Sequence, residues 1–350
     1  MRYAPRLIRA GLRVVLAVLA VLSEGACGSS EQTKESTAAS GSPGAFQPPA
    51  LPNGYLRLTA NPIRVPAGSD VTHCQYVMAP LDRDVDIVDV TGSQSTFGHH
   101  DVAFSYAPQP GDEVGSEVKC MMGNNEFTSG VSSTSSGVSA QALGGSFLGG
   151  AGPKGATTKL PAGVAFRLPK GQGVVLNLHY INPSGAAVTG YAYMDLKLAE
   201  VDPNRLIAAL FVNINGSFTL PPSAPTDSSM DCVAQSDVNL IMVANHMHEY
   251  GTHATSSVVR KDTGAIEVLR VDPVWTADMV NNPTYARWDV ASPFVLHAGD
   301  TIRTSCSWEN TSAAAIMFPR EMCITAAFAL ATGANPKAPA CYNGSWIASL

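Results

Sequence analysis

The residues of this chain that are best suited to chemistry are histidines in short, closely spaced groups. These groups are the adjacent pair His99 and His100, the single His179 inside an apolar stretch, and the pair His246 and His248. Neutral imidazole is a common ligand of copper and other transition metals. Residues i and i+2 of an extended segment project to the same face, so His246 and His248 can reach a single ion. Their spacing predicts a metal site.

The adjacent pair needs a local distortion to act in the same way. On a regular strand, His99 and His100 would point to opposite faces. A kink at the start of the strand would turn both rings to one side, and Gly98 is a residue that permits it. The remaining histidines lack such a context and are expected to be hydrogen-bonded polar residues: His73, His253 and His297.

The composition restricts both the fold and the class of partner. The chain has 350 residues, of which 14% are charged, and a formal net charge of −6. It therefore lacks the basic composition that neutralises a phosphate backbone, and we expect no nucleic-acid partner. Its 31 Gly and 24 Pro residues favour many short strands joined by turns. The predicted fold class is all-β.

Apolar alternation bounded by turn residues recurs along the chain and predicts strands. They cover residues 85–91, 102–106, 173–181, 191–198, 238–244 and 325–331. Two β-sandwich domains are the simplest architecture, at residues 51–202 and 203–350. The Gly/Ser-rich segment between residues 121 and 159 is expected to be either a surface excursion or disordered. No internal sequence repeat is strong enough to support the division.

The N-terminus has the order of a secretory signal, predicted at residues 1–27. Four arginines precede the apolar run 14–22, which is shorter than the roughly 20 apolar residues of a membrane span. Cys27 stands where a bacterial lipoprotein carries its acylated cysteine, but Glu24 replaces the apolar residue usual three positions earlier. A lipid anchor at Cys27 and ordinary cleavage near Ala26 are both open.

The polar residues 28–50 are expected to be a disordered tether, because they have little to bury. We expect an exported protein of the periplasm or cell surface that contacts a membrane only through the possible lipid anchor. Six cysteines remain when Cys27 is set aside, an even number that suits an oxidising compartment.

Five motifs in order resemble the copper type II, ascorbate-dependent monooxygenases, the family of peptidylglycine α-hydroxylating monooxygenase and dopamine β-hydroxylase. The resemblance covers residues 55 to 341, nearly the whole mature chain. The motifs are His73-Cys74 with Phe97-Gly98-His99-His100, Leu160-Pro161-Ala162-Gly163-Val164-Ala165-Phe166-Arg167, Leu176-Asn177-Leu178-His179-Tyr180, His246-Met247-His248-Glu249-Tyr250-Gly251, and Glu321-Met322-Cys323.

The resemblance implies two jelly-roll-like β-sandwich domains that face each other across a solvent-filled cleft, each with one copper ion. It implies that His99, His100 and His179 form an electron-transfer site, and that a catalytic, oxygen-binding site consists of His246, His248 and Met322. A Met thioether favours Cu(I), the state that meets O2. The family pattern also implies the disulfide pairs Cys74–Cys120, Cys232–Cys341 and Cys306–Cys323.

The implied activity is hydroxylation of a C–H bond with O2, with electrons from ascorbate or another reductant. Residues that hold a peptide carboxylate in the peptide-processing member are replaced by Ala244, Ile324 and Ala326. A site without those charge-assisted bonds favours a small, neutral or apolar substrate over a peptidylglycine. Two other functions are open: copper binding without catalysis, and a surface sandwich that binds no metal.

Overall fold

A computed structural model describes residues 46–120, 145–152, 155, 159–280, 282–331 and 338–348. The predicted signal, the tether up to residue 45, Cys27 and most of the Gly/Ser-rich segment lie outside the described residues. Residues Phe46–Leu350 form one unit by backbone contacts. No helix in the described ranges is long and apolar enough to cross a membrane.

The all-β prediction is confirmed, and a strand forms at each predicted position because the alternating apolar residues face a core. These strands are β4 (Val85–Gln94), β5 (Gly98–Tyr106), β8 (Gly173–Asn182), β10 (Ala192–Ala199), β14 (Val238–His246) and β21 (Ile324–Leu330). They begin or end up to four residues away from the predicted bounds.

The other strands were not predicted one by one. In the first half they are β1 (Leu56–Thr59), β2 (Ile63–Val65), β3 (Ser69–Met78), β6 (Phe147–Ala151), β7 (Val164–Leu168) and β9 (Val188–Gly190). In the second half they are β11 (Leu206–Ile214), β12 (Thr219–Leu220), β13 (Ala224–Val233), β15 (Gly251–Val259), β16 (Ile266–Asp272), β17 (Ala286–Arg287), β18 (Phe294–Leu296), β19 (Thr301–Asn310), β20 (Ile316–Met317), β22 (Ala340–Tyr342) and β23 (Ser345–Ile347). A 3₁₀ turn, η2, spans Ala277–Val280.

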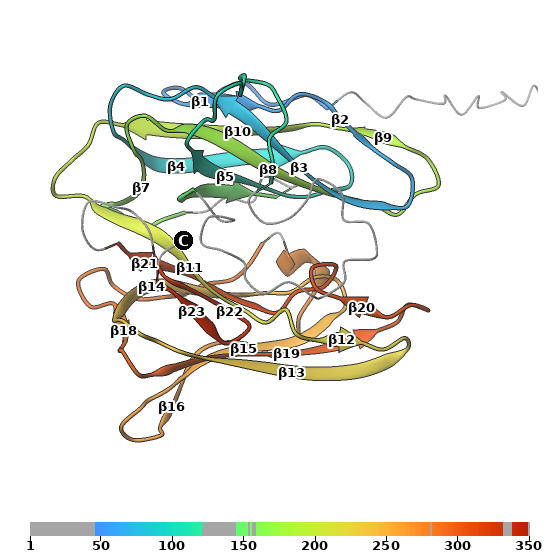
Figure 1. Ribbon diagram of the computed structural model, residues 1–350, viewed down its shortest axis with the longest axis vertical. Coiled ribbons are helices and arrows are strands. Elements are labelled where there is room, and N and C mark those ends of the chain that lie inside the picture. The colour runs from blue at the N-terminus through green and yellow to red at the C-terminus, as the bar shows by residue number, and fades with distance from the viewer. Residues whose placement is uncertain are drawn as a thin grey trace, which may run out of the picture. The chain divides into compact units, whose positions relative to one another are not determined.

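The strands of the two halves pair in the same pattern (Figure 1). In the first half, one set follows the order β1-β10-β4-β7 and a second sheet follows β3-β8-β5-β6. In the second half, the corresponding orders are β11-β21-β14 and β13-β19-β15-β16. The small pairs β2-β9 and β12-β20 also correspond. The structure therefore contains a repeat that the sequence does not display.

Two asparagines show the repeat at atomic detail. Asn182 ends β8 and Asn310 ends β19, and each side-chain amide donates to three main-chain carbonyls. The acceptors are Val65, Pro66 and Ala186 for Asn182, and Leu220, Pro221 and Ala314 for Asn310. The same amide thus closes the same corner in each half.

The predicted division at residues 202 and 203 falls in the turn between β10 and β11. After this turn, β11 pairs in parallel with β7 of the first half, and this pairing joins the two halves into an 11-stranded sheet. Phe328 on β21 packs against Phe147 and Phe166 of the first half, with ring centroids 5.7 and 5.5 Å apart. The first-half core therefore continues onto one face of the second-half sheet.

The structure contains the disulfides Cys74–Cys120, Cys232–Cys341 and Cys306–Cys323, which are the pairs implied by the resemblance. They close loops of 46, 109 and 17 residues. Each such bond contributes about 2–4 kcal/mol, chiefly by restricting the unfolded chain. Disulfides of this kind indicate an oxidising, extracytoplasmic compartment.

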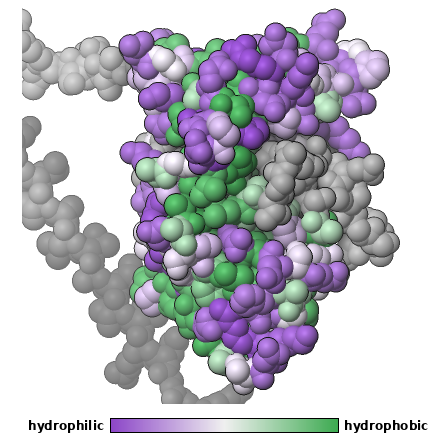
Figure 2. All heavy atoms as spheres, turned by 90° about the vertical axis from the view of Figure 1, so that its left-hand side faces the viewer, coloured by the Kyte–Doolittle hydropathy of each residue, from purple (hydrophilic) through white to green (hydrophobic). Residues whose placement is uncertain are grey.

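The surface is not uniformly polar. One face carries a strip of apolar side chains between polar margins (Figure 2). Elsewhere in the described chain, the edge strand β16 and the residues after it expose large apolar side chains, namely Ile266, Val268, Val271 and Val274.

A buried ion-pair cluster lies where the two halves join. The carboxylate of Asp86 on β4 has no exposed surface. It accepts hydrogen bonds from Arg167 on β7 at 2.9 Å and from Arg205, just before β11, at 2.5 Å. Removal of one partner from a buried ion pair leaves an uncompensated charge in a poorly solvated place. Asp86 therefore stabilises the junction.

We expect Asp86→Ala to lower the free energy of unfolding by about 3–5 kcal/mol, because two guanidinium groups lose their counter-charge. Glu200→Ala is the matched control, since Glu200 forms an exposed pair with Arg83 at 3.4 Å. That change should cost at most about 1 kcal/mol. Urea unfolding followed by tryptophan fluorescence measures both values. Equal losses in the two variants would contradict the importance of the cluster.

Candidate metal centre

The adjacent histidines lie at a distortion at the start of β5. Phe97 has a φ of 68°, and the pairing of β5 with β8 shifts register between Gly98 and His100. A Cβ at Gly98 would lie only 2.3 Å from the Cβ of Gln94, so a larger residue would displace this turn. The distortion brings the Nδ1 atoms of His99 and His100 to 2.8 Å. The kink that the sequence required is therefore present.

His179 on β8 completes a group of three. It lies directly opposite His100 in the strand pairing. Its ring centroid is 4.7 Å from that of His99 and 5.0 Å from that of His100. One ring nitrogen from each histidine can be chosen so that all three lie within 4.8 Å of one another. The group can hold a metal ion.

Asp70 on β3 orients His179, a role that the sequence did not reveal. The carboxylate accepts a hydrogen bond from His179 Nε2 at 2.6 Å. Because Nε2 carries the proton, the Nδ1 lone pair is free for a metal. Nothing in the spacing of Asp70 and His179, 109 residues apart, indicates this contact. It depends on the register of β3 against β8, which places Asp70 opposite Ile181.

The second histidine pair lies at the end of β14. His246 pairs with Ile324 of β21, and the His246 and His248 ring centroids are 5.3 Å apart. His248 Nδ1 donates to the main-chain oxygen of Arg320 at 3.0 Å. That bond leaves the lone pair on Nε2, which is buried and has no hydrogen-bond partner. His248 is thus prepared to act as a ligand through Nε2.

The two histidine sets meet. The rings of His99 and His248 are 4.5 Å apart between centroids, and those of His179 and His248 are 6.3 Å apart. His99 Nε2, like His248 Nε2, is buried without a partner. The resemblance implied two sites separated by a solvent-filled cleft, whereas these two rings are in contact. We call the five residues His99, His100, His179, His246 and His248 the histidine cluster.

Burial lowers the pKa of four of the five histidines of the cluster. Loss of solvent, reinforced by neighbouring histidines, lowers the pKa of His99, His100 and His248 well below its usual value. The same cause lowers the pKa of His246 to about 4. These four imidazoles are therefore neutral near pH 7, which is the protonation state that binds a metal ion.

Glu321 anchors the loop that carries His248. Its fully buried carboxylate accepts hydrogen bonds from the main-chain N–H groups of His248, Tyr250 and Met322. Burial raises the pKa of this carboxyl to about 7, although the three N–H donors act in the opposite direction. The Glu-Met-Cys motif contained this residue, but no role for it followed from the sequence.

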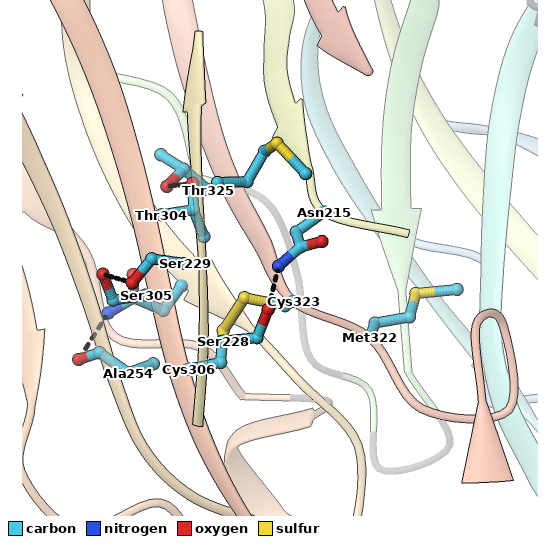
Figure 3. The surroundings of a disulfide bond; sticks show 12 residues. Asn215, Ser228, Ser229, Ala254, Thr304, Ser305, Cys306, Met322, Cys323 and Thr325 are labelled. Carbon is cyan, nitrogen blue, oxygen red and sulfur yellow. Dashed lines mark hydrogen bonds between the residues drawn. A yellow bond between two sulfur atoms is a disulfide. The ribbon is translucent and has the colours of Figure 1, made fainter. Parts of the chain in front are cut away.

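Met322 lies at the same end of the second-half sheet as His246. It precedes by two residues Ile324, the pairing partner of His246. The next residue, Cys323, is fully buried and bonded to Cys306, and the Met322 side chain points away from this disulfide (Figure 3). Around it lies an apolar group that includes Ile214, Phe318 and Ala326. The disulfide therefore restrains the backbone beside the thioether.

Polar residues outside the cluster differ in their environment. His73 and His297 are hydrogen-bonded as predicted, to Glu117 at 2.8 Å and to Asp237 at 3.4 Å. Asp101, which follows His100, is fully buried, and neither of its carboxylate oxygens has a partner in the described chain. Burial raises the pKa of Asp101 well above its usual value.

Comparisons with known proteins add little. No family model matches the chain, and no curated protein matches it. Among 41 matching solved chains is PBCV-1 VP54 in the virophage Sputnik, with 10% identity, a TM-score of 0.27 and coverage of 81% of this chain and 94% of that one. The infectious bursal disease virus Gx strain structure has 10% identity, a TM-score of 0.20 and coverages of 81% and 73%. The ANX2 ectodomain from Arabidopsis thaliana has 10% identity, a TM-score of 0.22 and coverage of 81% of this chain and 91% of that one. At such TM-scores these likenesses say nothing about activity.

We expect Asp70→Asn to lower the Cu(II) affinity of the His99, His100 and His179 group by about 10- to 100-fold. Asparagine keeps the shape of the side chain but removes the charge that orients His179. Asp237→Asn is the matched control, because Asp237 contacts the exposed His297. Competition titration with a chromophoric chelator measures the affinities. An unchanged affinity in Asp70→Asn would show that His179 does not depend on this carboxylate.

Proposed function

We propose that this chain is a copper-dependent monooxygenase that hydroxylates a C–H bond of a small, neutral or apolar substrate. O2 and ascorbate or another reductant are its co-substrates. The observation that carries the proposal is the histidine cluster, in which two sets of imidazoles from the two halves lie together. Two coppers, one per set, fit a reaction in which electrons are delivered one at a time.

The donor atoms suit copper. Three imidazoles form one set, and two imidazoles form the other, to which we assign the thioether of Met322, two residues before the strand partner of His246. Imidazole binds copper in both oxidation states, whereas a thioether favours Cu(I). Bound copper would supply one-electron chemistry with O2.

The chain itself supplies orientation. Asp70 keeps the proton on His179 Nε2 and directs Nδ1 to the group of three. The Arg320 carbonyl orients His248 through the other ring nitrogen. It accepts a hydrogen bond from Nδ1–H, which leaves the lone pair on Nε2. Glu321 holds His248 and Met322 in one loop arrangement through their main-chain N–H groups. Hydrogen bonds of this kind fix the orientation of metal-binding imidazoles and raise their basicity.

The region beside Met322 favours an apolar substrate. Ala244 on β14 lies opposite Ala326 on β21, and Ile324 is the next inward residue along β21. These side chains carry neither charge nor hydrogen-bonding groups, so they cannot hold a carboxylate as a peptide-binding member would. We therefore propose small, uncharged molecules with an accessible C–H bond as the substrates.

We place this activity outside the cytoplasm, in the periplasm or at the cell surface. The three disulfides support that placement. The proposed export signal and the possible acylation of Cys27 belong to the same hypothesis. Ascorbate or another small reductant would reach the protein there from solution.

Copper capture without catalysis is the second candidate, and one observation favours it. In the described part of the chain, a single group of three His, Cys, Asp or Glu ligands is close enough to hold an ion. A carrier needs only that group. The two functions differ in copper stoichiometry and in reductant-dependent O2 consumption.

We expect the exported protein to bind two copper ions per chain. His179→Ala and His248→Ala should each lower the count to one, because each removes a ligand from a different set. Elemental analysis after dialysis gives the counts, and an oxygen electrode with ascorbate and a small-substrate library tests turnover. One ion in the unmodified chain would favour the carrier, and none would favour a metal-free surface protein.

We expect Met322→Ile to weaken Cu(I) binding at the second set and to abolish hydroxylation. The change should leave the His99, His100 and His179 group loaded and reducible by ascorbate, and should cost under about 1.5 kcal/mol of stability. Met317→Ile, at an exposed methionine of β20, is the matched control. Unchanged Cu(I) affinity in Met322→Ile would mean that Met322 only packs against its neighbours.

A further inference from the structure

Arg320 contacts one histidine set directly and the other through Asp70. Its main-chain oxygen accepts a hydrogen bond from His248 Nδ1 at 3.0 Å. Its guanidinium Nε lies 3.8 Å from Asp70 Oδ2, and Asp70 Oδ1 accepts from His179 Nε2 at 2.6 Å. A continuous chain of contacts thus runs from His248 in the second half, through Arg320 and Asp70, to His179 in the first half.

The guanidinium is held in place from its other side. Glu249, which directly follows His248, accepts two hydrogen bonds from Arg320, one of them at 2.9 Å and the other from Nη2 to Oε1. The Arg320 guanidinium also lies 5.7 Å from the centre of the Tyr250 ring. A two-pronged Arg–carboxylate pair fixes the orientation of both groups. The segment that carries His248 therefore also aims the Arg320 side chain at Asp70.

We propose that Arg320 couples the two histidine sets, so that copper bound at one set raises the copper affinity of the other. Arg320 acts as a positioning residue in this proposal, and the proposal rests on the proposed function because it requires both sets to bind copper. Through this coupling, copper binding at one set would regulate copper binding at the other.

The coupling follows from ordering. A copper ion held by His248 Nε2 would polarise the ring and strengthen the hydrogen bond from Nδ1 to the Arg320 carbonyl. The backbone at residue 320 would then be restrained. The guanidinium, clamped by Glu249, then stays beside Asp70, which keeps His179 Nδ1 turned toward His99 and His100. The second ion meets a site that is already ordered and loses less conformational entropy on binding. By linkage, the effect is equal in the two directions.

Arg303 provides a matched control. It also forms a two-pronged pair, with Asp231 at 2.6 and 2.7 Å. This pair joins β13 and β19 and includes none of the five histidines. The arginine side chains are similarly exposed, 38% for Arg303 and 34% for Arg320. Substitution at Arg303 thus removes a comparable ion pair without touching the proposed connection.

The experiment is a Cu(I) titration of the full exported chain against a chromophoric chelator. The affinity of the His99, His100 and His179 set is measured with the second set filled, and again in His246→Ala, where the second set is incomplete. We expect at least about a 5-fold higher affinity with the second set filled. In Arg320→Met the ratio should fall to about 1, and in Arg303→Met it should stay at the wild-type ratio.

Two gentler variants keep the test decisive if Arg320→Met does not fold. Glu249→Gln weakens the clamp and should lower the ratio, and Arg320→Lys keeps the charge and should retain part of it. An affinity ratio of 1 in a wild-type chain with two ions bound overturns the coupling alone. An unchanged ratio in Arg320→Met does the same. If Arg320→Met does not fold, an unchanged ratio in Glu249→Gln takes its place. Fewer than two ions bound by the wild-type chain overturns the proposed function, and the coupling with it.

Discussion

The structure around the histidine cluster depends on one constraint: a buried imidazole nitrogen must have a partner. His99 Nε2 and His248 Nε2 have none, although both are inaccessible to water. Leaving a polar atom in this state costs about 1–3 kcal/mol. Asp70 accepts a hydrogen bond from His179 Nε2 and the Arg320 carbonyl accepts one from His248 Nδ1, so the lone pairs of these two rings are on His179 Nδ1 and His248 Nε2. A metal ion is the partner that such an arrangement of neutral nitrogens accepts most readily.

The duplicated fold puts its two ligand sets in different positions. In the first half, His100 on β5 lies opposite His179 on β8. At the corresponding pairing in the second half, His253 on β15 lies opposite Ser307 on β19. The second half therefore lacks the first half's set at that position and carries His246 and His248 at the end of β14 instead. Because this end faces the first half at His99, the repeat yields one shared centre.

The second set depends on restraints from outside the histidines. Its ligands lie in and beside loops, which are less rigid than strands. Glu321 ties the loop after β14 to the segment before β21, and the Cys306–Cys323 bond ties that segment to β19. The ion pair of Arg320 with Glu249 also joins the loop after β14 to the segment before β21. Together they give loop residues the precision that metal binding needs.

Sequence alone determined the all-β class, the positions of six strands and the identity of the histidines, because alternation and i, i+2 spacing are local properties of the chain. The kink at Gly98 was also foreseeable, since two adjacent ligands cannot share a face without one. Only the tertiary structure decided that His99 meets His248, that Asp70 holds His179, and that Arg320 reaches both sets. These contacts join residues 72 to 250 positions apart. Strand register and the packing of one half on the other bring these residues together, and no local sequence pattern encodes either.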